Sequence, residues 1–347
     1  MRLRLSGRAR ACAALACVGL MMASVPAPGS AQDPGYAITK RYQLGGEGDW
    51  DYLTFDTLAH RLFIARESHV LVVNPDDGAV IGDIPNTPHV HGVALAYELG
   101  RGFITAAGDT AVHIVDLKTL QPLGTVKVGL RDDAIVYDPA TKYVVSMNGK
   151  AHSASVIDAR TSKVVATIPL PGSPEFAVTD NHGTVYVNTE DTSLLVELDL
   201  ETLKVARQWS VAPCEGPSGL AFDRAHHRLF SGCHNQMMAI SDAQAGKVIA
   251  TVPIGRGVDA NRYDPGTGLA FSSNGDGTLT VVHEDSPSKF TVVGNLATQP
   301  GARTMALDPT THTVYLVTAQ FAPTVGHQVP KWPPAPGTFV LLVAEKR

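Results

Sequence analysis

The sequence is poor in charged residues and cysteine, and several familiar catalytic motifs are absent from it. Charged residues make up 18% of the chain, below the usual share of about a quarter, and the net charge is −5. No basic field therefore favours nucleic acid as a partner. There is no glycine-rich phosphate loop opening a helix, no nucleophile elbow, no haem-attachment motif and no convincing amphipathic helix. A catalytic or binding site in this protein must therefore be built from residues that are dispersed along the chain.

The start of the chain has a composition of its own. An apolar run over residues 11–25 and a small-residue segment, Gly29-Ser30-Ala31, follow four arginines: Arg2, Arg4, Arg8 and Arg10. This pattern predicts a secretory signal peptide over residues 1–31, cleaved after Ala31. The run is shorter than the roughly 20 residues needed to span a bilayer, and a lipid-modified Cys17 is the less favoured alternative. With no second apolar span, we expect a soluble protein that is periplasmic or secreted.

The rest of the chain repeats one sequence pattern: an apolar strand that ends at Asp, a polar turn, and a second apolar strand. The closing residues are Asp56, Ala96, Asp138, Asp180, Asp223, Asp264 and Asp308, and their successive separations are 40, 42, 42, 43, 41 and 44 residues. Two further strands follow in each copy but the last, where one follows. A period of about 40–45 residues with several short strands is typical of propeller blades.

This repeat predicts an all-β chain, a seven-bladed β-propeller with four antiparallel strands per blade, with six or eight blades as less favoured counts. The last copy ends after its third strand. We expect the N-terminal segment Tyr36–Leu44 to supply the missing fourth strand and so close the ring. One domain would then span residues 32–347.

Two cysteines remain after removal of the predicted signal peptide, Cys214 and Cys233. They flank the first two strands of one repeat, so both are expected at the same rim. In an oxidising compartment this favours a disulfide over two free thiols or a metal thiolate.

One register of the repeat is polar, at the position that opens each inner strand. It holds Asp51, His91, Asp133, Glu175, Ser218, Asp259 and Arg303. Carboxylates gathered at one mouth would repel one another unless a cation intervenes. The first interpretation is a small-ligand site formed by these residues without Ser218, with a possible divalent metal or organic cation held by Asp133, Glu175, Asp259 and His91. In the second, Arg303 holds a polar or anionic substrate while a carboxylate acts as general base. Solvated turn residues are the third interpretation.

The repeats GLAFDRAHHRLF and AISDAQAGKVIATVPIG resemble those of the YVTN-repeat β-propellers, the YncE-like group of exported bacterial proteins. The signature of that family appears in degenerate form over Val185–Asp191 and Val314–Gln320. The resemblance implies a seven-bladed periplasmic protein that binds a ligand or a partner. Seven-bladed lactonases carry Pro-Arg-His at an inner strand, and the matching place here reads Ala302-Arg303-Thr304, where the arginine alone agrees.

We therefore predict an exported propeller that binds a small polar ligand, a cation or a partner protein through its central funnel, with a monomer favoured. A lactonase-like hydrolase is the alternative. A proline-rich insertion at residues 321–337 interrupts the last blade; it is expected to cover the funnel, to meet a partner, or to be a surface loop tied down by Trp332. His60, His227 and His312 share one register in the first hairpin turn, and His226 is interpreted as a neighbour in that turn.

Overall fold

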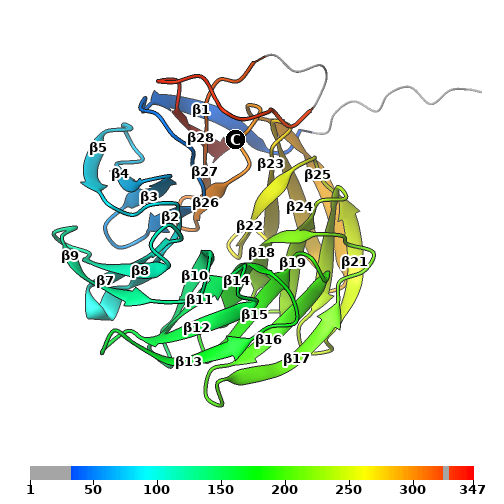
Figure 1. The fold of residues 1–347 in the computed structure, drawn as a ribbon. Coiled ribbons are helices and arrows are strands. Elements are labelled where there is room, and N and C mark those ends of the chain that lie inside the picture. Colours follow the sequence, from blue (N-terminus) through cyan, green and yellow to red (C-terminus); the bar gives the residue numbers. More distant parts are fainter. Residues whose placement is uncertain (1–32, 323–327) are drawn as a thin grey trace, which may run out of the picture. The chain divides into compact units, whose positions relative to one another are not determined.

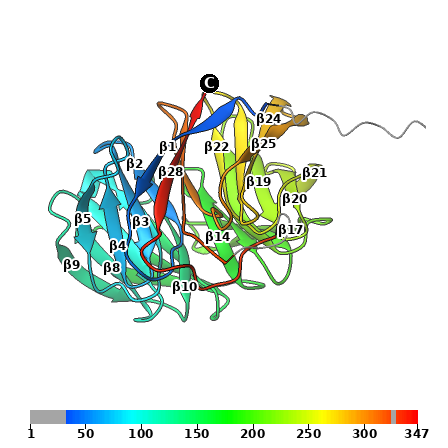
Figure 2. The same ribbon diagram turned by 90° about the horizontal axis from the view of Figure 1, so that it is seen from above.

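The computed structural model describes residues 33–322 and 328–347, which form seven four-stranded antiparallel sheets and one short 3-10 turn. The sheets surround a common centre, as Figure 1 shows, and Figure 2 shows the same ring from above. The prediction of a seven-bladed all-β propeller is confirmed. The predicted signal peptide lies outside the described residues.

Each of the first three blades runs from an inner to an outer strand. Blade one contains β2 (Leu53–Asp56), β3 (Arg61–Arg66), β4 (His69–Val73) and β5 (Val80–Ile84). Blade two contains β6 (Val90–Ala96), β7 (Arg101–Ala106), β8 (Ala111–Asp116) and β9 (Pro122–Lys127), with the 3-10 turn η1 (Tyr97–Leu99) after β6. Blade three contains β10 (Asp132–Asp138), β11 (Tyr143–Asn148), β12 (Ser153–Asp158) and β13 (Lys163–Pro169).

The next three blades repeat this order. Blade four contains β14 (Pro174–Thr179), β15 (Thr184–Thr189), β16 (Leu194–Asp199) and β17 (Lys204–Ser210). Blade five contains β18 (Pro217–Asp223), β19 (Arg228–Cys233), β20 (Met237–Asp242) and β21 (Lys247–Pro253). Blade six contains β22 (Val258–Asp264), β23 (Leu269–Asn274), β24 (Thr278–Ser286) and β25 (Lys289–Ala297).

The seventh blade joins the two ends of the described chain. It contains β26 (Met305–Asp308), β27 (Thr313–Thr318), β28 (Val340–Lys346) and, as its outer strand, β1 (Tyr36–Gln43). The pairing runs from Tyr36 opposite Lys346 to Gln43 opposite Val340. Inner strands β26 and β2 also contact one another, as do successive inner strands around the ring. The expected closure by the N-terminal segment is therefore present.

The second strand of each blade shows why the blades need their neighbours. Strands β3, β7, β11, β15 and β19 are buried along all but their first residue, because each is covered on both faces by adjacent blades. Phe63, Phe103, Phe230 and, in the second strand of blade six, Phe271 occupy one register and are fully buried. Each such ring contributes about 1.5–3 kcal/mol by burial. Outer strands such as β9 are mostly exposed.

The repeated Asp closes the first hairpin of a blade. In blade one, Oδ1 of Asp56 accepts hydrogen bonds from the backbone N–H groups of Leu58 and Ala59, at 3.1 and 3.0 Å. This is the local geometry for which Asp is favoured in turns. His60, His227 and His312 lie at the equivalent position of this hairpin turn in three different blades, each with a positive φ (48°, 57° and 59°). The turn register read from the sequence is therefore present.

Candidate functional site

The polar register predicted from the repeat lies around one cavity of about 320 Å³ at the mouth of the ring. All seven of its members line that cavity: Asp51, His91, Asp133, Glu175, Ser218, Asp259 and Arg303. Each stands at or just before the start of an inner strand. The sevenfold repeat thus carries seven side chains to one place.

Irregular pairing positions several of these side chains. In blades two to six the register between the first and second strands shifts at the site residue, for example between Val90 and Val93 around His91 and between Asp132 and Ile135 around Asp133. The same shift occurs in β14, β18 and β22. A bulge leaves a residue out of the ladder and re-aims its side chain. We infer that this local irregularity turns the side chains toward the ring axis.

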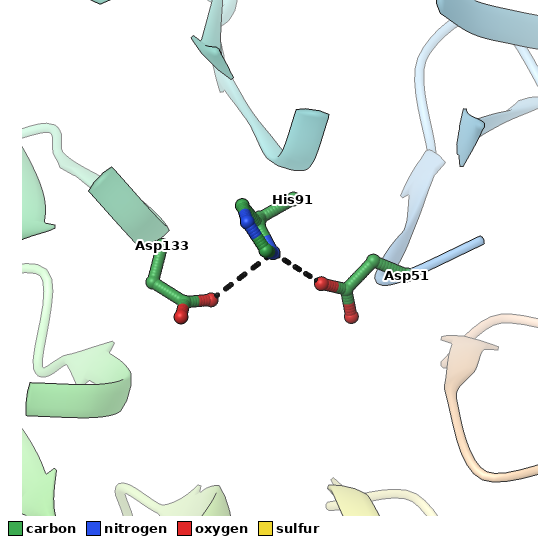
Figure 3. A group of neighbouring side chains, drawn as sticks. All are labelled: Asp51, His91 and Asp133. Carbon is green, nitrogen blue, oxygen red and sulfur yellow. Dashed lines mark hydrogen bonds and ion pairs between the residues drawn. The ribbon is translucent and has the colours of Figure 1, made fainter. Parts of the chain in front are cut away.

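We call Asp51, His91 and Asp133 the mouth trio. Nδ1 of His91 lies 2.5 Å from Oδ2 of Asp51 and 3.5 Å from Oδ1 of Asp133, and Figure 3 shows the imidazole between the two carboxylates. The three come from blades one, two and three. Their ligand atoms all lie within 4.8 Å of one another, so they have the chemistry and the spacing to hold a metal ion.

The grouping differs from the predicted metal set of His91, Asp133, Glu175 and Asp259. Glu175 and Asp259 line the same cavity but stand outside the trio, and Asp51 takes their place. The reason is the order of the blades around the ring. The trio comes from three consecutive blades, whereas Glu175 and Asp259 come from blades four and six.

On another side of the cavity, Asp259 is held in a network. Nε of Arg303 lies 2.9 Å from Oδ2 of Asp259. The hydroxyl groups of Ser218 and Tyr52 donate to Oδ1 at 3.3 and 3.4 Å. Burial raises the pKa of Asp259, and the Arg303 charge partly opposes this shift. Burial opposes the charge of Arg303 too, but Asp259, Asp51 and Asp49 together raise the pKa of that guanidinium.

Glu175 is the carboxylate whose charge is least compensated. Within the described residues no hydrogen bond or ion pair is formed by its side chain, and the charges that act on it belong to Asp133, Asp259, Glu190 and Asp51. Burial and these carboxylates raise its pKa well above the usual range. Burial likewise raises the pKa of Asp133 to about 7, although His91 opposes the shift. Two neighbouring acids thus carry a proton, or a cation, more readily than solvated acids do.

One aromatic side chain, Tyr52, lines the mouth cavity. The ring of Tyr52 meets that of Phe176 edge-on at 4.7 Å, and the guanidinium of Arg262 lies 5.2 Å from the centre of Phe176. Tyr52 lines the mouth cavity, while Phe176 and Arg262 line a separate cavity of about 190 Å³. This stack therefore lies between the two cavities.

Several lining residues were not predicted. Tyr52, His234 and Val329 also face the mouth cavity, as does Arg131. Tyr52 is adjacent to Asp51, and His234 follows Cys233, so both stand one residue away from a position that the sequence marked. A second cluster outside the mouth, Asp223, His226 and Glu284, was not foreseen either.

The disulfide and the proline-rich insertion both lie beside the mouth. Cys214 and Cys233 are joined, with their Cα atoms 5.5 Å apart. In the insertion, Trp332 packs on Trp50 with ring centres 4.6 Å apart, and the Arg303 guanidinium lies 5.4 Å from the Trp332 ring. The described part of the insertion therefore contacts the wall of the site.

Comparisons with known proteins bear on the fold. No family model and no curated protein matches the chain. A chain of the mitotic checkpoint complex is similar in structure, with a TM-score of 0.73, 15% identity, and coverage of 99% of this chain and 98% of that one. The WD40 repeats of RRP9 are similar with a TM-score of 0.71 and 10% identity, over 91% of this chain and 99% of that one. A chain of Kuenenia stuttgartiensis hydrazine synthase is similar with a TM-score of 0.68 and 14% identity, over 80% of this chain and 94% of that one.

These similarities, at low identity, show the β-propeller fold and nothing finer. Among residues 33–322 and 328–347, no helix has the length and apolar character needed to cross a bilayer.

Proposed function

We propose that this chain is an exported propeller that binds a small organic cation in its mouth cavity. The main supporting observation is the charge of the residues that line the cavity. They include four carboxylates (Asp51, Asp133, Glu175 and Asp259) but two guanidinium groups, those of Arg131 and Arg303. One of those guanidinium groups is already engaged by Asp259. The carboxylate of Glu175 has no cationic partner within the described chain, so a ligand ammonium group would supply one.

The size and chemistry of the cavity support an organic ligand. A volume of about 320 Å³ exceeds what a single ion needs and falls within the range of small-molecule sites. Tyr52 supplies an aromatic wall, which is a favourable surface for a cation. Arg131 and His234 would contact any acidic or polar part of the same ligand.

A divalent metal in the mouth trio is the second candidate, favoured by the 4.8 Å limit that encloses its ligand atoms. The hydrolase alternative requires a free electrophile for a carbonyl oxygen, either a metal or Arg303. The ion pair between Arg303 and Asp259 weakens the second version of that alternative.

Export to the periplasm or the medium is part of the proposal. It is supported by the signal-peptide pattern of residues 1–31 and by the disulfide, because such bonds persist in oxidising compartments. Affiliation with the YVTN-repeat propellers is also proposed, supported by the degenerate motifs at Val185–Asp191 and Val314–Gln320. An N-terminus at Gln32 in the exported protein, read by mass spectrometry, is the expected result.

Melting temperatures of the chelator-treated protein, measured with a panel of primary amines, diamines and amino acids, test the ligand class. A ligand at about 100 times its Kd adds about 2.7 kcal/mol to the free energy of unfolding. We expect at least one amine to raise the melting temperature and Glu175→Gln to remove that effect. Glu201→Gln, at an exposed turn, is the matched control. No response to any amine, or an equal response in Glu175→Gln, would contradict the proposal.

A further inference from the structure

A second cluster of acidic and imidazole groups lies at the opposite end of an inner strand. Asp223 closes β18, whose start carries Ser218 at the mouth, and His226 stands in the turn that follows. Glu284 reaches the same place from β24 of blade six. We call Asp223, His226 and Glu284 the rim trio. Their ligand atoms all lie within 4.8 Å of one another.

The distances within the rim trio converge on one point. Nδ1 of His226 lies 2.7 Å from Oδ2 of Asp223 and 3.1 Å from Oε1 of Glu284. A single N–H cannot serve both oxygens well. Separations near 3 Å are instead those expected between neighbouring ligands of an ion bound at about 2.0–2.2 Å from each.

The two carboxylates are buried, which makes their proximity costly. The side chain of Glu284 is 2% exposed and that of Asp223 is 3% exposed. No hydrogen bond of good geometry reaches either carboxylate oxygen of Glu284 within the described chain, although the Tyr263 hydroxyl and Nδ1 of His226 lie close to this carboxylate. Burial and the charge of Asp223 raise the pKa of Glu284, and Tyr263 and His226 offset this only in part. A buried carboxylate that faces a second buried carboxylate requires a proton or a cation between the two.

Two other blades have a different kind of partner beside the repeated Asp. Asp138 accepts a hydrogen bond of 2.7 Å from the Thr179 hydroxyl of the next blade, and Asp264 lies 2.8 Å from Nδ1 of His312, also in the next blade. In both cases the neighbouring blade provides a donor. At Asp223 the neighbouring blade provides a second acceptor, Glu284. Where the other two blades have a hydrogen-bond donor beside the Asp, this blade has the carboxylate of Glu284. The two carboxylates of Asp223 and Glu284 therefore face each other as a pair of possible metal ligands.

We propose that the rim trio binds a divalent first-row transition ion, with two carboxylates and one imidazole as ligands. The imidazole favours such an ion over magnesium or calcium, which prefer oxygen alone. The half-exposed His226 leaves the remaining coordination positions to water. The ion would join blade five to blade six and so stabilise this part of the ring. The site is independent of the ligand proposed for the mouth.

Zinc is the probe, and the test uses the full exported protein after chelator treatment. Zinc titrations by calorimetry are made in an Asp51→Asn, Asp133→Asn background, so that the mouth trio does not contribute. We expect one zinc equivalent per chain and a higher melting temperature with zinc. Adding Glu284→Gln should abolish this zinc binding.

Glu284→Gln also reports on folding. Its amide can donate to Asp223 as Thr179 donates to Asp138, so in chelator its melting temperature should equal or exceed that of the parent. His312→Ala is the matched control, because it removes a similar His–Asp contact with Asp264 and should leave zinc binding unchanged. The proposal is overturned if the mouth-disabled parent binds no zinc, or if Glu284→Gln binds it equally well. The first result would assign the rim trio a shared proton instead.

Discussion

The mouth trio and the rim trio use the same kinds of residue at opposite ends of the inner strands, yet their surroundings differ. In the mouth trio the side chains of Asp51 and Asp133 are 17% and 7% exposed and face a cavity of about 320 Å³. In the rim trio both acids are almost fully buried, and only His226 reaches solvent. The first arrangement accommodates an organic ligand with several contacts. The second has the dimensions of an ion.

The two trios also differ in how the chain assembles them. The mouth trio takes one residue from each of three consecutive blades, all at one register of the repeat. The rim trio takes two residues from one hairpin and the third from the neighbouring blade. A site of the first kind follows from the period, whereas a site of the second kind depends on a contact between blades.

At a single pH, the largest expected effect concerns the disulfide, which links two segments at the mouth side only. Replacing Cys214 and Cys233 together by Ser removes a link between positions 19 residues apart. A closed loop of that size is worth about 3 kcal/mol of unfolding free energy. Guanidinium denaturation should register this loss, and ligand affinity at the mouth should fall while zinc affinity at the rim is kept. An unchanged denaturation midpoint in the double variant would contradict the prediction.

The next effect concerns the ion pair at the mouth. Arg303→Met leaves the buried Asp259 without its cation, and we expect a loss of about 2 kcal/mol at pH 7, because the pair is less buried than those that cost about 3–5 kcal/mol. The pKa of Asp259 is already raised, so the acid can take up a proton and the loss should shrink at pH 5. Urea denaturation at both pH values provides the measurement. Arg160→Met, which breaks the ion pair between the exposed Arg160 and Asp158, should cost less than about 1 kcal/mol.

The third prediction concerns the pH dependence of stability in the unliganded protein, to which Asp133 contributes. Burial raises the pKa of Asp133 from 3.8 to about 7, so between these values the folded chain binds more protons than the unfolded chain. The stability supplied by the protonated acid is therefore lost as pH rises from about 4 to about 7, with a slope of up to about 1.4 kcal/mol per pH unit. Asp133→Asn should flatten the slope measured in chelator. Asp83→Asn, at an exposed position of β5, should leave it unchanged. An equal slope in Asp133→Asn would refute the assignment.

The smallest effect compares the two imidazoles directly. His91 is 22% exposed and His226 is 48% exposed, so truncation of His91 should be the more costly. We expect a loss of about 1–2 kcal/mol for His91→Ala and of less than about 1 kcal/mol for His226→Ala, both in chelator. Chemical denaturation of the two variants provides the comparison. The reverse order would mean that the mouth trio contributes less to the fold than the rim trio.

Most of the fold could be predicted from the sequence because a propeller repeats one local pattern. The Asp that closes six of the seven first strands set the register, and the same register located the mouth residues. The N-terminal segment was assigned correctly because the last repeat lacked a fourth strand, a gap that β1 fills.

The side-chain groupings could not be predicted in the same way. The expected metal set included Glu175 and Asp259, whereas the structure groups Asp51 with His91 and Asp133, because neighbouring blades approach most closely. Glu284 was missed because β24 has nine residues where β20 has six, so it projects past the usual strand end. His226 was interpreted as a turn residue, which it is, and its contact with blade six is not encoded in the period.

The most direct test of the central claim is proton release on ligand binding at the mouth. The tightest amine from the melting screen would be titrated into chelator-treated protein at pH 6.5, in two buffers of different ionisation enthalpy. A cation that binds Glu175 and Asp133 must displace their protons, so we predict proton release that is reduced in Glu175→Gln and unchanged in Glu284→Gln. Binding without proton release, or release that Glu175→Gln leaves unaltered, would contradict the claim that the mouth carboxylates hold the cation.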